Sequence, residues 1–166
     1  MSTTENLMAA FAGESQANRK YLAFAKKAEA EGFPQIARLF RAAAEAETIH
    51  AHAHLRVLDG VKGTEANLMA AIEGEGHEFK DMYPEFLKAA EAEGNKAAVM
   101  SFKYALDVEK IHYDLYSKAL ETFKAGGDLP AADIYVCPVC GNTEIGHAPD
   151  KCHICNVAGD KFIKVA

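Results

Sequence analysis

Two copies of a Glu-x-x-His motif carry side chains that could bind metal ions. The first runs from Glu47 to His50 and the second from Glu109 to His112. A spacing of three places both side chains of each motif on one helix face. That face also carries apolar residues such as Phe40, so the carboxylates point where the apolar residues point. Burying unpaired carboxylates costs several kcal/mol, and the pattern therefore predicts bound cations.

Two other predicted helices each direct a glutamate to the same kind of face. Glu14 shares the stripe of Phe11, and Glu75 shares the stripe of Ile72. Two Glu-x-x-His motifs plus one Glu from each remaining helix form the di-metal carboxylate arrangement of four-helix bundles. A single Glu-x-x-His motif on an Ala/Glu-rich helix is usually a surface ion pair. The repetition argues against that interpretation, and oxygen-rich ligands with histidine favour iron or manganese over zinc or copper.

Glu78 is an additional carboxylate with no counterpart in the first helix, where Ala17 stands in the unshifted register. An additional carboxylate binds a metal ion more strongly when the charge of the ion increases. We therefore expect a mobile Glu78 to replace neutral His50 as a ligand when the metal pair becomes more positive. Tyr21 and Tyr83 follow the inward glutamates and are placed to hydrogen-bond ligand carboxylates from outside. The alternative for both tyrosines is a packed aromatic residue of the core.

Four cysteines form a CxxC-x11-CxxC pattern, which strongly indicates a tetrahedral four-sulfur metal site. They are Cys137, Cys140, Cys152 and Cys155. Spacing alone leaves iron and structural zinc both open. The residue after each second cysteine is expected to adopt positive φ, so that backbone N–H groups reach sulfur; Gly141 and Asn156 stand at these positions.

The elements that position these residues are four long helices, predicted from Ala, Glu, Lys and Leu between glycine and proline breakers. The blocks are 4–31, 35–58, 65–93 and 96–125. Pro34 fits a first helical turn, Thr64 is expected to cap the third helix, and Pro84 should kink or interrupt it. The helices form a duplicated hairpin. The motif residues recur at an offset of 62, whereas Glu14 and Glu75 are 61 apart, one residue out of step.

Composition excludes several classes of protein. The chain has 166 residues, 49% of them hydrophobic, and a net charge of -6. The acidic balance and the lack of basic runs argue against nucleic-acid or anionic-membrane binding. No apolar run is long enough to span a membrane, and residues 1–136 contain no cysteine, so we expect a cytoplasmic protein with a metal site rather than disulfides.

Over nearly its full length the sequence resembles the rubrerythrin family, on the carboxylate, histidine, tyrosine and cysteine motifs above. The resemblance implies a mainly α fold: a ferritin-like di-iron four-helix bundle at 1–128, followed by a small rubredoxin-like domain with a four-cysteine iron site at 129–166. It implies two irons held by Glu14, Glu47, Glu75, Glu109 and His112, with His50 and Glu78 exchanging on one iron. Glu47 and Glu109 would bridge. His153 and Asn156 stand where rubredoxin-like knuckles usually carry Pro and Gly.

The resemblance also implies the activity of a peroxidase that reduces hydrogen peroxide to water as an oxidative-stress defence. Electrons would pass through an iron in the four-cysteine site. The sequence has no Gly-x-Gly-x-x-Gly motif, so an external NAD(P)H-dependent reductase or small redox protein must supply them. Alternatives are a ferroxidase or iron-storage protein, a manganese-catalase-like enzyme with a structural zinc ribbon, and a non-enzymatic zinc-ribbon module.

The link between the second and third helices predicts a homodimer. A ferritin-like bundle needs these helices parallel, so the link must cross about 30 Å. The six residues 59–64 reach only about 20 Å. We therefore expect domain swapping between 1–59 and 64–125. The family resemblance further implies that each sulfur site serves a di-iron site of a neighbouring subunit.

Overall fold

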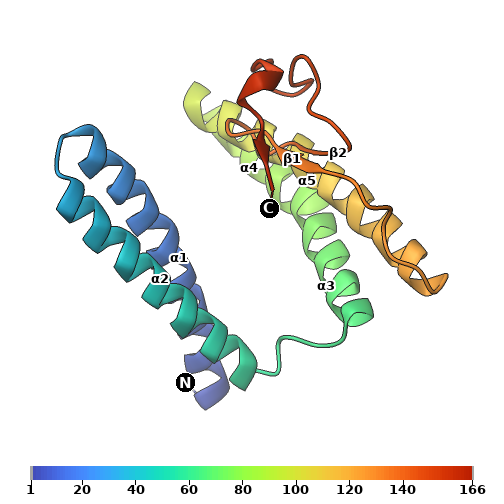
Figure 1. Cartoon of the computed structure of the whole chain (residues 1–166), viewed down its shortest axis with the longest axis horizontal. Coiled ribbons are helices and arrows are strands. Elements are labelled where there is room, and N and C mark those ends of the chain that lie inside the picture. The colour runs from blue at the N-terminus through green and yellow to red at the C-terminus, as the bar shows by residue number, and fades with distance from the viewer. Residues whose placement is uncertain (1, 166) are drawn as a thin grey trace. The chain divides into compact units, whose positions relative to one another are not determined.

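The computed structural model describes residues 2–165, and these fall into two compact units, residues 2–62 and 63–165 (Figure 1). The first unit is a helical hairpin. The second contains a further helical hairpin and a small β-sheet. The division between Lys62 and Gly63 lies inside the link that the sequence analysis identified.

The first hairpin consists of α1 (Thr3–Ala30) and α2 (Pro34–Val57). Ser2 and Glu5 form a capping box at the start of α1, which satisfies free N–H groups of the first turn. Pro34 occupies the first turn of α2 as predicted, where a missing N–H costs nothing. Alanines including Ala25, Ala37 and Ala44 are buried, so the two backbones pack closely.

The second hairpin pairs a broken helix with α5 (Lys96–Lys124). The broken helix comprises α3 (Thr64–His77), a π-helical turn η1 (Glu78–Met82) and α4 (Tyr83–Ala92). The prediction that Thr64 caps this helix is wrong. Gly63 is the capping residue, and Thr64 is the first helical residue with no side-chain cap.

The π-helical turn explains both the interruption and the repeat that is out of step. Within it the N–H of Tyr83 donates to the carbonyl of Glu78, five residues earlier. A π-turn accommodates one extra residue in a helix while the flanking segments keep their faces. This is the residue by which the spacing from Glu75 to Tyr83 exceeds that from Glu14 to Tyr21. Pro84, in the first turn of α4, needs no hydrogen bond there.

Matching aromatic clusters confirm the duplication of the hairpin. In the first unit the ring centroids of Phe24 and Phe40 are 5.6 Å apart, with Tyr21 6.3 Å from both. In the second unit Phe86 and Phe102 are also 5.6 Å apart, with Tyr83 6.2 Å from both. Each residue of one cluster recurs at an offset of 62 in the other. Both tyrosines are therefore packed aromatic residues, whatever their phenols contact.

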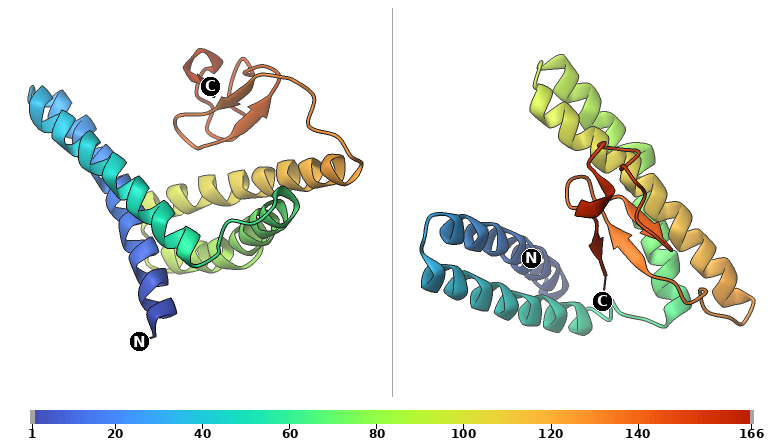
Figure 2. Two further views of the ribbon diagram at one scale, coloured as in Figure 1. Left: turned by 60° about the horizontal axis from the view of Figure 1, so that its bottom comes forward. Right: turned by 45° about the horizontal axis from the view of Figure 1, so that its top comes forward.

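The C-terminal segment forms a three-stranded antiparallel sheet of order β2-β1-β3 beside α5 (Figure 2). Its strands are β1 (Ile134–Val136), β2 (Thr143–Ile145) and β3 (Ile163–Lys164), with a short 3-10 turn η2 (Gly159–Lys161) before β3. The predicted domain boundary at 128/129 lies between α5 and β1 and stays a prediction. Within residues 2–165 no helix is long and apolar enough to cross a membrane.

Candidate metal centres

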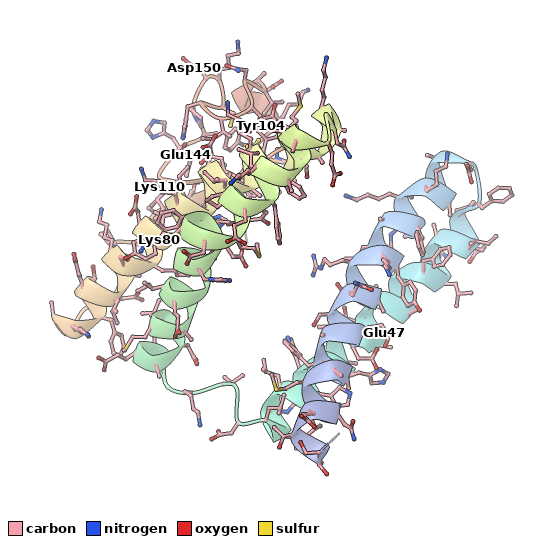
Figure 3. All side chains as sticks on the ribbon, turned by 180° about the vertical axis from the view of Figure 1, so that it is seen from behind. Glu47, Lys80, Tyr104, Lys110, Glu144 and Asp150 are labelled. Atoms are coloured by element: carbon pink, nitrogen blue, oxygen red, sulfur yellow. The ribbon has the colours of Figure 1, made fainter. Side chains whose placement is uncertain are left out.

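The first hairpin brings together three of the predicted ligands. Ligand atoms of Glu14, Glu47 and His50 all lie within 4.8 Å of one another. Nδ1 of His50 is 2.9 Å from Oε2 of Glu47, which lies one helical turn earlier on α2. Glu47 is labelled in Figure 3. His50 is exposed, and among the described residues its Nε2 has no hydrogen-bond partner. We call this cluster the N-terminal half-site.

The second hairpin repeats the arrangement with Glu75, Glu109 and His112, again within 4.8 Å of one another. Nδ1 of His112 lies 2.8 Å from Oε2 of Glu109. Burial raises the pKa of Glu75 to about 7, and the neighbouring charge of Glu109 and a hydrogen bond between the two carboxyl groups act in the same direction. We call this cluster the C-terminal half-site.

Glu78 and Tyr83 lie in the electrostatic field of the C-terminal half-site without joining its three-ligand cluster. Burial, followed by the charge of Glu109, raises the pKa of Glu78. Burial, followed by the charges of Glu78 and Glu109, raises the pKa of Tyr83. Glu78 opens the π-helical turn, a backbone irregularity often found at functional sites. Among the described residues neither Tyr21 nor Tyr83 donates a hydrogen bond to a ligand carboxylate.

The four cysteines converge as the spacing predicts. Their sulfurs lie within 4.8 Å of one another, with Cys137 to Cys155 at 3.5 Å and Cys140 to Cys152 at 3.6 Å. A disulfide would require about 2.05 Å. Metal–sulfur bonds of about 2.3 Å in a tetrahedron give edges of about 3.8 Å, so the sulfurs are spaced for a single metal ion.

Two equivalent backbone knuckles hold these cysteines. Gly141 and Asn156 both adopt positive φ, 88° and 64°, which confirms the sequence prediction. Their N–H groups donate to the carbonyls of Cys137 and Cys152 at 3.0 and 2.9 Å. The second knuckle thus keeps the form of the first despite Asn156 in place of glycine.

Backbone N–H groups also reach the sulfurs of both knuckles. The N–H of Asn142 donates to Cys140, and that of Val157 donates to Cys155. Burial works against ionisation of Cys152, but backbone N–H groups of Cys155 and Ile154 lower its pKa to about 7. Such donors favour a thiolate, the form that binds metal.

The first knuckle of the four-cysteine site packs directly against α5 of its own chain. A methyl group added at Gly141 would lie 3.7 Å from Cγ1 of Val108, which precedes Glu109. Nε2 of His112 lies 3.0 Å from Oγ1 of Thr143 on β2. The expectation that each sulfur site serves a di-iron site of a neighbouring subunit stays a prediction. The C-terminal half-site meets the four-cysteine site without a partner chain.

Thr143 and Asn142 are residues that sequence reasoning missed. Asn142 is fully buried and its side chain donates to Oε1 of Glu144 at 2.9 Å and to the sulfur of Cys152 at 3.9 Å. Thr143 was missed because no spacing rule relates a strand residue to a histidine 31 positions earlier. In the sequence, these two residues are marked only by their place directly after the knuckle glycine, Gly141.

The donor atoms fit iron at both kinds of site. In each half-site a carboxylate oxygen lies within 2.9 Å of an imidazole nitrogen, and burial together with the charge of Glu109 raises the pKa of Glu75, as expected for clustered carboxylates that a cation would neutralise. Carboxylate and imidazole ligands suit iron, and four thiolates in a tetrahedron suit a single iron or zinc.

The sequence is similar to those of known proteins. The sequence model of the Rubrerythrin family matches residues 5–120. The chain is 39% identical to Rubrerythrin-2 of Clostridium acetobutylicum, over 96% of this chain and 95% of that one. It is 38% identical to nigerythrin of Nitratidesulfovibrio vulgaris, over 97% and 85%.

A solved structure of nigerythrin, in a partially reduced state, superposes with a TM-score of 0.60 at 36% identity, covering 99% of this chain and 87% of that one. Rubrerythrins are oxidoreductases that bind iron at a carboxylate site and at a four-cysteine site. The match extends over most of the sequence and over both sites. The chain therefore belongs to the rubrerythrin family and holds iron at sites of both kinds.

Proposed function

We propose that this protein is a non-haem di-iron peroxidase that reduces hydrogen peroxide to water. An external NAD(P)H-dependent reductase or small redox protein supplies the electrons through the four-cysteine site. Irons held by the carboxylate and histidine ligands would supply the electrons for peroxide reduction, and an iron held by the four cysteines would supply a one-electron path from the external donor. Four cysteines kept as thiols suit the cytoplasm, where we propose that the protein acts.

The observation that supports this proposal best is the contact between the first cysteine knuckle and α5. Gly141 packs on Val108, and Thr143 reaches His112, so the sulfur site adjoins the ligands of the C-terminal half-site. An electron donor must lie close to the centre that it reduces. A structural zinc ribbon has no reason to contact a metal ligand.

The residues have separate roles in this proposal. In an assembled bundle that brought the two half-sites together, Glu47 and Glu109 would be the ligands shared by the two ions, and Glu14, Glu75 and His112 would each hold one ion. His50 and Glu78 exchange on one ion. Two features favour that exchange: His50 has no partner on Nε2 among the described residues, and Glu78 sits in the π-helical turn.

The rival functions use the carboxylate site without the sulfur site. A ferroxidase or iron-storage protein has no need of the four-cysteine site, and a manganese-catalase-like enzyme turns over without an external electron donor. Under either function the packing of Gly141 on Val108 would have no functional meaning. Metal content separates the three: iron in both sites supports the peroxidase, while zinc in the four-cysteine site would sever its electron supply.

The proposal is tested by steady-state peroxide consumption with a supplied reductase. Cys137→Ser should lose the red thiolate–iron colour and the reductase-dependent rate, while the carboxylate site keeps its iron. Glu109→Gln should lose carboxylate-bound iron and about 100-fold or more in rate, because outer partners of metal ligands alone cost 10–100-fold. Glu121→Gln, an exposed change on the same helix, is the matched control.

Three outcomes of these measurements would contradict the proposal. Full peroxide turnover by Cys137→Ser with the same reductase would remove the four-cysteine site from the mechanism. Unchanged iron content and rate in Glu109→Gln would overturn the ligand assignment. Turnover of peroxide without any reductase would favour the catalase-like function.

A further inference from the structure

The hydroxyl of Thr143 lies between the two metal sites of the second unit. Its Oγ1 is 3.0 Å from Nε2 of His112 and 3.3 Å from the carbonyl oxygen of Gly141. Thr143 is partly buried on β2, where it pairs with Val136. A threonine hydroxyl has one proton to donate and lone pairs to accept, so the proton can go to only one of these two partners at a time.

The state of His112 decides which partner receives that proton. Without metal, Nδ1–H of His112 can donate a hydrogen bond to Oε2 of Glu109 at 2.8 Å. Nε2 then accepts a hydrogen bond from the Thr143 hydroxyl. With a metal ion bound at Nδ1, the ring proton of His112 would be on Nε2, which would donate it to the hydroxyl oxygen of Thr143. The hydroxyl of Thr143 then donates to the Gly141 carbonyl.

The same peptide group continues the connection to sulfur. The carbonyl of Gly141 and the N–H of Asn142 belong to one peptide group, and that N–H donates to the sulfur of Cys140. A hydrogen bond accepted by a peptide carbonyl polarises the group and strengthens the bond that its N–H donates. Two groups, the Thr143 hydroxyl and the Gly141–Asn142 peptide, thus join a ligand of the carboxylate site to a ligand of the four-cysteine site through three hydrogen bonds.

We propose that this relay, from His112 through Thr143 and the Gly141–Asn142 peptide to Cys140, couples the two metal sites. A metal ion on His112 strengthens the N–H···S bond at Cys140 and so raises the reduction potential of the thiolate-bound iron. Hydrogen bonds to the sulfurs are among the features that set the potential of such centres. Thr143 is a positioning residue, and the inference needs iron in the four-cysteine site but not the proposed peroxide reduction.

The test measures the reduction potential of the four-cysteine site by spectroelectrochemistry, with iron in the sulfur site and the carboxylate site either empty or loaded with zinc. In the unaltered protein zinc should raise the potential. Thr143→Val keeps the shape and strand preference of threonine but removes the hydroxyl. It should reduce the zinc-induced rise, leaving only the part due to the charge of zinc. Thr143→Ser should restore the full rise.

Thr122→Val is the matched control, because Thr122 lies on α5 and its hydroxyl donates only to the carbonyl of Lys118 among the described residues. It should behave as the unaltered protein. An equal zinc-induced rise in Thr143→Val and Thr122→Val would overturn the relay. Retention of the red colour in Thr143→Val establishes that the four-cysteine site has folded.

Nuclear magnetic resonance gives a second, independent measurement. In zinc-loaded protein with 15N-labelled histidine, the Nε2 proton of His112 should exchange slowly with water, and in Thr143→Val it should exchange rapidly. Metal bound through Nε2 instead of Nδ1 would also overturn the relay. Neither measurement needs peroxide turnover, so failure of the peroxidase proposal would leave both results interpretable.

Discussion

At the scale of single residues, the raised pKa of Glu75 makes the stability of the metal-free protein depend on pH. Its pKa is raised to about 7 by burial and by Glu109, whereas in an unfolded chain it returns to about 4.5. Between these values the folded protein binds more protons than the unfolded one, so the free energy of unfolding falls as pH rises. We expect metal-free protein to be less stable at pH 8 than at pH 5.5, measured by urea unfolding.

Glu75→Gln removes this titration and should flatten the dependence between those two pH values. Glu121→Gln should leave it unchanged, because Glu121 is exposed on α5 far from the cluster in sequence. Metal-loaded protein should show the opposite trend, since protonation of the ligands releases the metal. The same pH dependence in Glu75→Gln and in the parent protein would assign it to another group.

Asn156 is a second residue with a measurable consequence. Its φ of 64° lies in the left-handed region, which glycine adopts freely and which costs other residues roughly 1–2 kcal/mol. Asn156→Gly should hold the metal of the four-cysteine site at least as well as the parent. Asn156→Val should bind it more weakly, because a β-branched residue is poorly accommodated there. Thermal bleaching of the thiolate–iron colour measures both, and equal bleaching in the two variants would contradict the explanation.

The residues that bear the chemistry were predictable where a local spacing encodes them. Glu47 and His50, or Cys137 and Cys140, are neighbours within one helical turn or one knuckle, so the sequence suffices. Thr143 was not predictable, because its contact with His112 depends on how the sheet packs on α5. That packing is long-range and has no periodic signature.

At the scale of elements, the π-helical turn separates two otherwise equivalent hairpins. Deleting Asp81, an exposed residue of η1, gives Glu75 and Tyr83 the spacing that Glu14 and Tyr21 have in α1. We expect this variant to fold and to keep its carboxylate-bound iron. Deleting the exposed Lys20 from α1 should instead rotate Glu14 by about 100° away from its face and lose iron.

Iron content per chain and helical circular dichroism on heating measure both deletions. The two changes are matched, since each removes one exposed residue between an inward glutamate and an aromatic-cluster tyrosine. If deletion of Asp81 abolished iron binding while deletion of Lys20 did not, the π-turn could not be the site of the extra residue.

Element prediction succeeded for the helices and missed the detail of their ends. Composition and breakers placed four helical blocks, and the offset of 61 against 62 signalled an extra residue. The form that the extra residue takes was not predictable, because a π-turn, a kink at Pro84 and a break all satisfy the same spacing. Thr64 was assigned as a cap from residue type alone, while the backbone of Gly63 already turns into the helix.

At the scale of the whole molecule, the hairpins leave large apolar side chains exposed. In the first unit Leu39 is 69% exposed, Ile49 59% and Phe24 47%. Large apolar side chains gathered on one small unit indicate a surface that another element covers. This observation supports the proposed swapped homodimer, in which 1–59 of one chain would pair with 64–125 of another.

A longer link tests the swap. Eight Gly/Ser residues inserted between Lys62 and Gly63 extend the reach to about 46 Å, enough to cross the bundle within one chain. We expect the parent protein to be dimeric and the lengthened variant to be monomeric with full iron content, measured by light scattering and metal analysis. The same insertion between Gly126 and Gly127 should leave the dimer intact. A parent monomer with a complete metal pair would rule out the swap.

The extra residue in η1 has a consequence for the symmetry of the bound metals. Duplication alone would give two equivalent sets of ligands. Only one copy carries the insertion and the additional carboxylate of Glu78, and, among the described residues, only one of the two motif histidines is anchored by a threonine. Two ions held by these ligands therefore occupy chemically distinct environments, which resolve as separate quadrupole doublets in a Mössbauer spectrum.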